Sequence, residues 1–183
     1  MKRTKLKQKC IIIDIDETIA YEPFTDDLPY GAENKREAWD EYHAKRKYYS
    51  TKIIKPIRET IELIEGYYSS SHTPPTVIFL TARENTHNGL ILLNTYRFIR
   101  KYFKCFNDTR DFGSKYYLLM RPENDFRPSD IIKEQYLKDN ILPYYNVVLA
   151  FDDDIRNIDM FLKNGITVIQ PHSIDVYNLM NSN

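Results

Sequence analysis

The stretch Ile11-Ile12-Ile13-Asp14-Ile15-Asp16-Glu17-Thr18 decides the fold, because it joins a strongly apolar run directly to a pair of carboxylates. Consecutive isoleucines are typical of a strand that is buried on both faces of a parallel sheet. Residues two apart along a strand share a face, so Asp14 and Asp16 can present both carboxylates on one side. Unpaired, the two charges would be costly there, and a bound divalent cation would remove that cost. The alternative is that both aspartates only shape a turn or cap a helix.

Four further apolar runs follow and alternate with helical patterns. Together with the first run, the predicted strands are Cys10–Ile15, Thr76–Leu80, Tyr116–Met120, Val147–Phe151 and Ile166–Ile169. The predicted helices are Pro56–Tyr67, Thr86–Phe103, Pro128–Lys138 and Ile155–Lys163, the last of which ends at Asn164-Gly165. Alternating strands and helices predict a Rossmann-like α/β fold, with a parallel five-stranded sheet sandwiched by helices.

The length of 183 residues predicts a single domain, 1–183. Its core is expected at about 9–20 and 55–175. The segment 21–54 is too long for a simple connection, and a helical pattern lies near 32–48. We therefore expect a small cap insertion at about 21–54, over the edge of the sheet where the strands end.

Composition excludes several classes of protein. The 26 Lys and Arg residues balance 26 Asp and Glu residues, so net charge favours neither nucleic acid nor membrane as a partner. No apolar stretch is long enough to span a membrane, and the start of the chain does not resemble a signal peptide. The two cysteines have no metal-ligand spacing. A cytoplasmic location is expected, in the host cytoplasm if the source is a phage or virus.

Polar residues that could take part in catalysis occur at three later places in the chain. Thr81 and Arg83 come after the second strand, where a hydroxyl and a guanidinium can bind phosphate oxygens. Alternatively, Thr81 caps the next helix. Lys133 stands three residues after Asp130 on a predicted helix, and the simpler interpretation is a surface ion pair. The run Asp152-Asp153-Asp154 is either a solvated loop or part of a Mg²⁺ site.

Taken in order, these residues resemble the four motifs of the haloacid-dehalogenase (HAD) superfamily of phosphatases. Within it, the closest resemblance is to the 3′-phosphatase domains of phage polynucleotide kinase–phosphatases. It covers about residues 10–172 and is carried by Leu118-Leu119-Met120-Arg121, by Asp125 to Lys133, by Ala150-Phe151-Asp152-Asp153 and by Ile158 to Ile166. Two departures stand out: Glu17 stands where glycine is commoner, and Asp154 stands where the phage domain has an arginine.

The resemblance implies a role for each motif residue. Asp14 would be the nucleophile, Asp16 the general acid and base, and Thr81 and Lys133 the groups that stabilise the transferring phosphoryl oxygens. Mg²⁺ would be held by Asp14, Asp152 and Asp153, and by Asp16 through its backbone carbonyl. The remaining implied residues contact substrate; they are Thr18, Arg83, Arg121 and Arg127.

These roles predict a Mg²⁺-dependent hydrolase that removes 3′-phosphates from nucleic-acid ends through an aspartyl-phosphate. No phosphate-binding loop of the kinase type is present, so no kinase domain is expected. The alternative is a nucleotidase or another small-molecule phosphatase of the same superfamily, and a third hypothesis is a non-enzymatic end-binding module. DNA, RNA and mononucleotide substrates, the preference for 3′ or 5′ phosphate, and the oligomeric state stay open.

Overall fold

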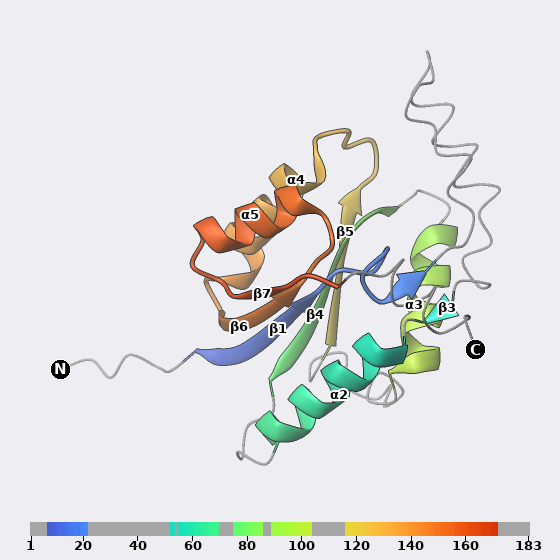
Figure 1. Cartoon of the computed structure of the whole chain (residues 1–183). Coiled ribbons are helices and arrows are strands. Elements are labelled where there is room, and N and C mark those ends of the chain that lie inside the picture. Colours follow the sequence, from blue (N-terminus) through green and yellow to red (C-terminus); the bar gives the residue numbers. More distant parts are fainter. Residues whose placement is uncertain are drawn as a thin grey trace.

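The computed structural model describes residues 7–21, 52–53, 55–69, 75–85, 89–103 and 116–171. Their main feature is a parallel five-stranded sheet with helices on both faces (Figure 1). The strands lie in the order β5-β4-β1-β6-β7. Their bounds are β1 Gln8–Ile13, β4 Thr76–Asn85, β5 Tyr116–Pro122, β6 Tyr145–Phe151 and β7 Val168–Ile169. The predicted Rossmann-like α/β fold is confirmed.

The helices divide between the two faces because side chains alternate along the central strand β1. Ile11 and Ile13 pack on the face covered by α2 (Lys55–Ser69) and α3 (Leu90–Tyr102). Cys10 and Ile12 pack on the other face. That face carries α4 (Ser129–Tyr136), the π-helical turn η3 (Leu137–Ile141) and α5 (Ile155–Lys163). Among the described helices, none has both the length and the apolar character needed to cross a membrane.

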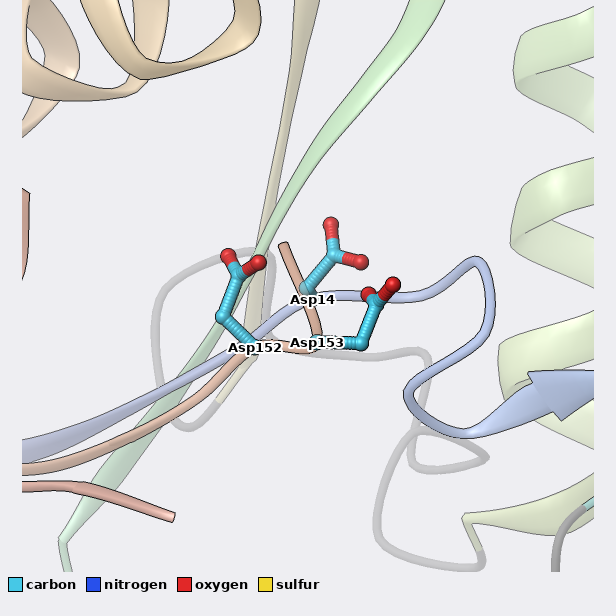
Figure 2. Close-up of side chains that lie close together, drawn as sticks. All are labelled: Asp14, Asp152 and Asp153. Atoms are coloured by element: carbon cyan, nitrogen blue, oxygen red, sulfur yellow. The ribbon is translucent and has the colours of Figure 1, made fainter. Parts of the chain in front are cut away.

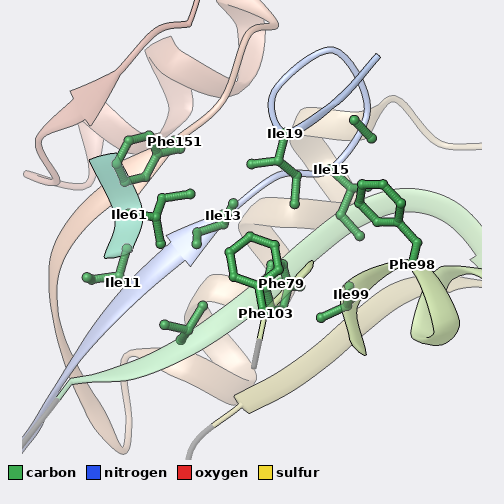
Figure 3. Close-up of a cluster of buried hydrophobic side chains, with 12 residues drawn as sticks. Ile11, Ile13, Ile15, Ile19, Ile61, Phe79, Phe98, Ile99, Phe103 and Phe151 are labelled. Carbon is green, nitrogen blue, oxygen red and sulfur yellow. The ribbon is translucent and has the colours of Figure 1, made fainter. Parts of the chain in front are cut away.

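The α2 and α3 face holds the larger cluster of buried aromatic and branched side chains (Figure 3). Phe79 on β4 meets Phe103, at the end of α3, edge to face with 5.2 Å between ring centroids. Ile61 from α2 is fully buried in the same cluster. Such packing anchors both helices to the sheet, because each buried side chain contributes on the order of 2 kcal/mol through the hydrophobic effect.

The order of the strands sets the position of the site. From β1 the chain moves outward to β4 and β5, and then crosses to β6 on the opposite side of β1. Ligands of open α/β sheets bind at such a switch, beyond the carboxyl ends of the strands. The register pairs Ile13 with Phe151, and the Asp14 N–H donates to the Phe151 carbonyl at 2.9 Å. Asp14 and Asp152 therefore leave the sheet side by side.

Of the strand boundaries that differ from the sequence prediction, the ends of β1 and β4 bear on the site. β1 ends at Ile13 and not at Ile15, because the chain turns at Glu17, which has a left-handed φ of 56°. Glycine adopts this conformation more easily than glutamate, which gives a physical reason why glycine is commoner than glutamate at this position in the superfamily that the sequence resembles. β4 extends to Asn85, five residues beyond the predicted end, and its register with β5 shifts between Thr81 and Glu84. Thr81 and Arg83 therefore belong to the strand and its bulge.

The predicted insertion begins and ends at one place. β2 (Ala20–Tyr21) pairs antiparallel with β3 (Lys52–Ile53), which brings the two ends of the insertion together. Residues 22–51, including the predicted helix near 32–48, lie outside the described residues. The predicted start of the helix at Thr86 lies outside them as well, whereas α5 matches its predicted bounds. The single domain with a cap at 21–54 stays a prediction.

The packing of α5 on the sheet can be tested by truncating two adjacent hydrophobic side chains of this helix, one buried and one exposed. Phe161 is fully buried and Leu162 is 56% exposed. We expect Phe161→Ala to lower the free energy of unfolding by about 3–5 kcal/mol, because it leaves a cavity. Leu162→Ala should change it by no more than about 0.5 kcal/mol. Urea denaturation followed by circular dichroism measures both, and equal effects of the two variants would contradict the packing described.

Candidate active site

Three carboxylates gather where β1 and β6 end (Figure 2). One oxygen each of Asp14, Asp152 and Asp153 lies within 4.8 Å of the others. Asp14 is 6% exposed and Asp152 is 1% exposed, so these two are not part of a solvated loop. We call these three residues the acidic cluster. The predicted convergence of two distant segments on one place is present in the structure.

Lys133 from α4 is inserted between two members of the acidic cluster. Its Nζ donates to Asp14 Oδ1 and to Asp152 Oδ2, both at 2.7 Å. Burial at 2% exposure would lower the pKa of Lys133, but the two carboxylates together outweigh burial and raise it. Lys133 is therefore charged, and the interpretation of this lysine as a surface residue is wrong.

The acidic cluster still carries more negative than positive charge. Burial raises the pKa of Asp14 well above its usual range; Lys133 opposes this, and the carboxylates of Asp152 and Asp153 add to it. Burial also raises the pKa of Asp153, to about 6, with a further contribution from Asp152. A divalent cation would relieve this repulsion, and an all-oxygen donor set with few carboxylates suits Mg²⁺. The residues present therefore fit the predicted metal.

Two buried polar side chains orient the acidic cluster. The hydroxyl of Thr18 lies 3.0 Å from Asp153 Oδ1 and 3.3 Å from Asp14 Oδ2. Asn157 donates its Nδ2 to Asp152 Oδ1 at 2.9 Å. Sequence reasoning assigned Thr18 to substrate and missed Asn157, whose only signal is its position in the first turn of the helix after the acidic run. Ligating carboxylates commonly depend on such supporting hydrogen bonds.

Asp154 does not belong to the acidic cluster. Its side chain caps α5 by accepting from the Arg156 N–H at 2.9 Å, and it also pairs with the Arg156 guanidinium. A carboxylate at this position is the usual choice for a helix N-cap. Of the three consecutive aspartates, only the first two reach the cluster.

Asp16 lies outside the cluster of three and pairs with Arg83. Arg83 Nε donates to Asp16 Oδ2 at 2.8 Å, and Arg83 Nη2 donates to Asp16 Oδ1 at 2.7 Å. The expectation that Asp14 and Asp16 share one face assumed a strand up to Ile15, but β1 ends at Ile13. Asp16 as a metal ligand through its backbone carbonyl stays a prediction, as does Arg83 as a contact to substrate.

Thr81 lies inside β4 and is 1% exposed, so it does not cap the following helix. Its hydroxyl oxygen accepts from the Arg83 backbone N–H at 3.2 Å. A hydroxyl whose oxygen accepts one bond can still donate its own proton. The Thr81 hydroxyl can therefore still donate one hydrogen bond, and its role as a donor to a phosphate oxygen stays a prediction.

The other two predicted arginines stabilise the loop after β5. Arg121 donates from Nε to the Ala82 carbonyl at 2.9 Å and from Nη1 to the carbonyls of Asp125 and Arg127, at 2.7 and 2.6 Å. Arg127 is 47% exposed and pairs with Asp125, and its hydrogen bonds lower the pKa of Asp125 to about 2. Arg121 therefore braces the loop, while Arg127 faces solvent.

Comparison with known proteins agrees with this arrangement. A family model described as the polynucleotide kinase PNKP phosphatase domain matches residues 8–175. Two solved structures share the fold: the "Pnkp1/Rnl/Hen1 RNA repair complex", with a TM-score of 0.62 over 90% of this chain, and the "Pnkp1/Rnl/Hen1 complex", with 0.61 over 93%. Both are 23% identical, and the chain spans only 42% and 51% of those chains. No curated protein matches the sequence.

The raised pKa of Asp153 gives a test of the metal site. Because its folded pKa of about 6 lies above the ordinary 3.8, ionised Asp153 destabilises the metal-free protein increasingly as pH rises from about 4 to 7. In EDTA, Asp153→Asn should be more stable than the wild type at neutral pH, and this difference should vanish near pH 4. Added Mg²⁺ should reverse the order, because the wild type binds the ion more tightly.

Thermal unfolding between about pH 4 and pH 7 measures these differences. Asp154→Asn is the matched control, because it changes an adjacent carboxylate that caps α5, and it should keep the full response to Mg²⁺. Equal stabilisation of the wild type and Asp153→Asn by Mg²⁺ would show that the acidic cluster is not the metal site.

Proposed function

The chain belongs to the family of polynucleotide kinase PNKP phosphatase domains, among the HAD phosphatases, and on that premise we propose that it is a Mg²⁺-dependent phosphomonoesterase that removes 3′-phosphates from nucleic-acid ends. One observation carries the catalytic part of the proposal. A buried lysine holds Asp14 beside Asp152 and Asp153, at the carboxyl ends of two neighbouring strands. This arrangement supplies a fixed nucleophile next to a cation site.

Asp14 is the nucleophile in this proposal. Its Oδ1 is held by Lys133, which fixes the orientation of the carboxylate and reduces its repulsion from an incoming phosphate dianion. Attack on phosphorus forms the bond between Asp14 and phosphate and breaks the bond to the 3′ oxygen. Water then hydrolyses the aspartyl-phosphate, releases inorganic phosphate and regenerates the carboxylate.

Asp16 serves as the general acid and base. It gives a proton to the departing 3′ oxygen and later takes one from the attacking water, so its protonation is restored after each turnover. Its side chain is 31% exposed, so reactants can approach it, and Arg83 fixes its plane. Two aspartates are needed because the nucleophile is covalently occupied during the hydrolytic step.

The remaining residues stabilise charge. Lys133 and Thr81 provide an ammonium and a hydroxyl for the equatorial phosphoryl oxygens. Asp14, Asp152 and Asp153 would hold Mg²⁺, with the backbone carbonyl of Asp16 as a further ligand, and the ion would neutralise charge between nucleophile and phosphate. These groups are fixed before substrate arrives, because Lys133, Asp152 and Thr81 are buried within the folded core.

The choice of a nucleic-acid end rests on the family and on the loop after β5. Arg127 is exposed on a loop that Arg121 braces, so its guanidinium can reach a backbone phosphate without a large loss of loop entropy. One of the two solved structures that share the fold is an RNA repair complex, which supports testing RNA ends beside DNA ends. The second candidate is a nucleotidase, because the same chemistry acts on any accessible phosphomonoester.

Replacing the nucleophile tests the mechanism. Asp14→Asn keeps an oxygen for the Lys133 hydrogen bond but cannot form a stable acyl phosphate, so we expect kcat to fall by at least about 1,000-fold. The matched control is Asp159→Asn, since Asp159 is exposed and pairs with Lys163 on α5. Release of inorganic phosphate with Mg²⁺ measures the rate. Undiminished turnover by Asp14→Asn would reject the assignment of the nucleophile.

A substrate panel tests the specificity. It compares DNA and RNA oligonucleotides carrying 3′ or 5′ phosphate with 3′ and 5′ mononucleotides, with Mg²⁺ and with EDTA. We expect the highest kcat/KM for 3′-phosphorylated oligonucleotides, and Arg127→Ala should raise KM severalfold for these substrates alone. Arg97→Ala, on the exposed side of α3, serves as the control. Faster cleavage of 5′ mononucleotides would identify a nucleotidase.

A further inference from the structure

Beside the acidic cluster, three side chains from three elements form a continuous chain of hydrogen bonds. Thr95 lies on α3, Arg83 lies in the bulge of β4, and Asp16 lies in the turn after β1. Arg83 Nη1 donates to Thr95 Oγ1 at 3.1 Å, while Arg83 Nε and Nη2 donate to the two oxygens of Asp16. Each of the three guanidinium nitrogens therefore donates to a protein acceptor.

Exposure falls along this chain from Asp16 inward. The side chain of Asp16 is 31% exposed, that of Arg83 is 1% exposed, and Thr95 is fully buried. Only the carboxylate at the outer end meets solvent, so an approaching phosphate meets Asp16 before it meets Arg83. This arrangement favours Arg83 as a support for Asp16 over Arg83 as a direct contact to substrate.

The bond to Thr95 supplies a restraint that the ion pair alone lacks. Two parallel bonds hold the carboxylate of Asp16 coplanar with the guanidinium, but that pair can still turn together as one planar unit. A third bond, from the remaining nitrogen to a fixed point on α3, stops this rotation. The Asp16 carboxylate, which exchanges the proton, would then keep one orientation.

We propose that Thr95 is a positioning residue for Asp16 and acts through Arg83. This inference rests on the proposed function, in which Asp16 is the acid and base. Thr95 touches neither substrate nor metal; it fixes the direction from which Asp16 exchanges its proton. Small errors in such positioning reduce rates strongly, by up to about 100-fold for a displacement of about 1 Å.

A double-mutant cycle separates this role from a merely structural one. The four proteins are the wild type, Thr95→Val, Asp16→Asn and the double variant. Their kcat and KM are measured with p-nitrophenyl phosphate and Mg²⁺, because its good leaving group keeps the rates of Asp16→Asn measurable. Thr95→Val should lower kcat about tenfold with KM unchanged, and it should lower kcat less than about twofold in the Asp16→Asn background.

Two further variants serve as controls. Thr95→Ser keeps the acceptor oxygen and should retain nearly the wild-type kcat. Thr76→Val makes the same isosteric change at another buried threonine, which begins β4 at its opposite end, and it should leave kcat unchanged. If Thr95→Val does not fold, Arg83→Lys replaces it in the same cycle, because lysine keeps the charge but cannot make all three bonds.

Each outcome decides the proposal. A loss of kcat from Thr95→Val that occurs only when Asp16 is intact, and not in the Asp16→Asn variant, supports the positioning role. Equal losses in both backgrounds, or a rise in KM in place of a fall in kcat, would overturn it, because they indicate damage to the fold or lost phosphate binding. These results would leave the proposed function standing. A wild-type protein that hydrolyses no phosphomonoester would overturn both.

Discussion

The ammonium of Lys133 between Asp14 and Asp152 is the interaction on which the site depends. The two carboxylates belong to segments 119 and 19 residues from the lysine, and all three side chains are nearly excluded from water. Removing one partner from a buried ion pair typically costs about 3–5 kcal/mol, because it leaves an uncompensated charge. The lysine therefore stabilises the carboxylates in the absence of metal and holds Asp14, the proposed nucleophile, in place, so one interaction would serve both folding and chemistry.

The sheet makes this interaction possible through its register. Ile13 pairs with Phe151, so the next residue on each strand is an aspartate, and both leave the sheet at the same height. Lys133 reaches both aspartates because α4 packs on the sheet, where the Tyr136 hydroxyl also donates to the Met120 carbonyl at 2.7 Å. The site is thus a consequence of parallel register and one helix position, and the loops add supporting hydrogen bonds.

The features that could be predicted from the sequence are those that neighbouring residues determine. The isoleucine run, the acidic run after β6 and the bounds of α5 follow from periodicity, burial and capping within a few residues. The pairing of Arg83 with Asp16, 67 residues away, depends on where β4 ends and on its bulge, and no local signal encodes either. Asn157 was missed for a similar reason, since an asparagine in the first turn of a helix is ordinary until the fold brings it to Asp152.

The three arginines that were predicted to contact phosphate show how contacts between distant residues change the expected mode of substrate binding. Sequence reasoning assigned Arg83, Arg121 and Arg127 alike to phosphate contacts, but the structure engages all the nitrogens of Arg83 and most of those of Arg121 within the protein. Among these three, only Arg127 is substantially exposed. If binding depends on one such contact and on the terminal phosphate, few counterions are released, so the salt dependence of binding should be shallow. Under the proposed function, recognition of the phosphomonoester would then rest mainly on the acidic cluster, a cation bound there and Lys133, and the loop after β5 would add the preference for a polynucleotide.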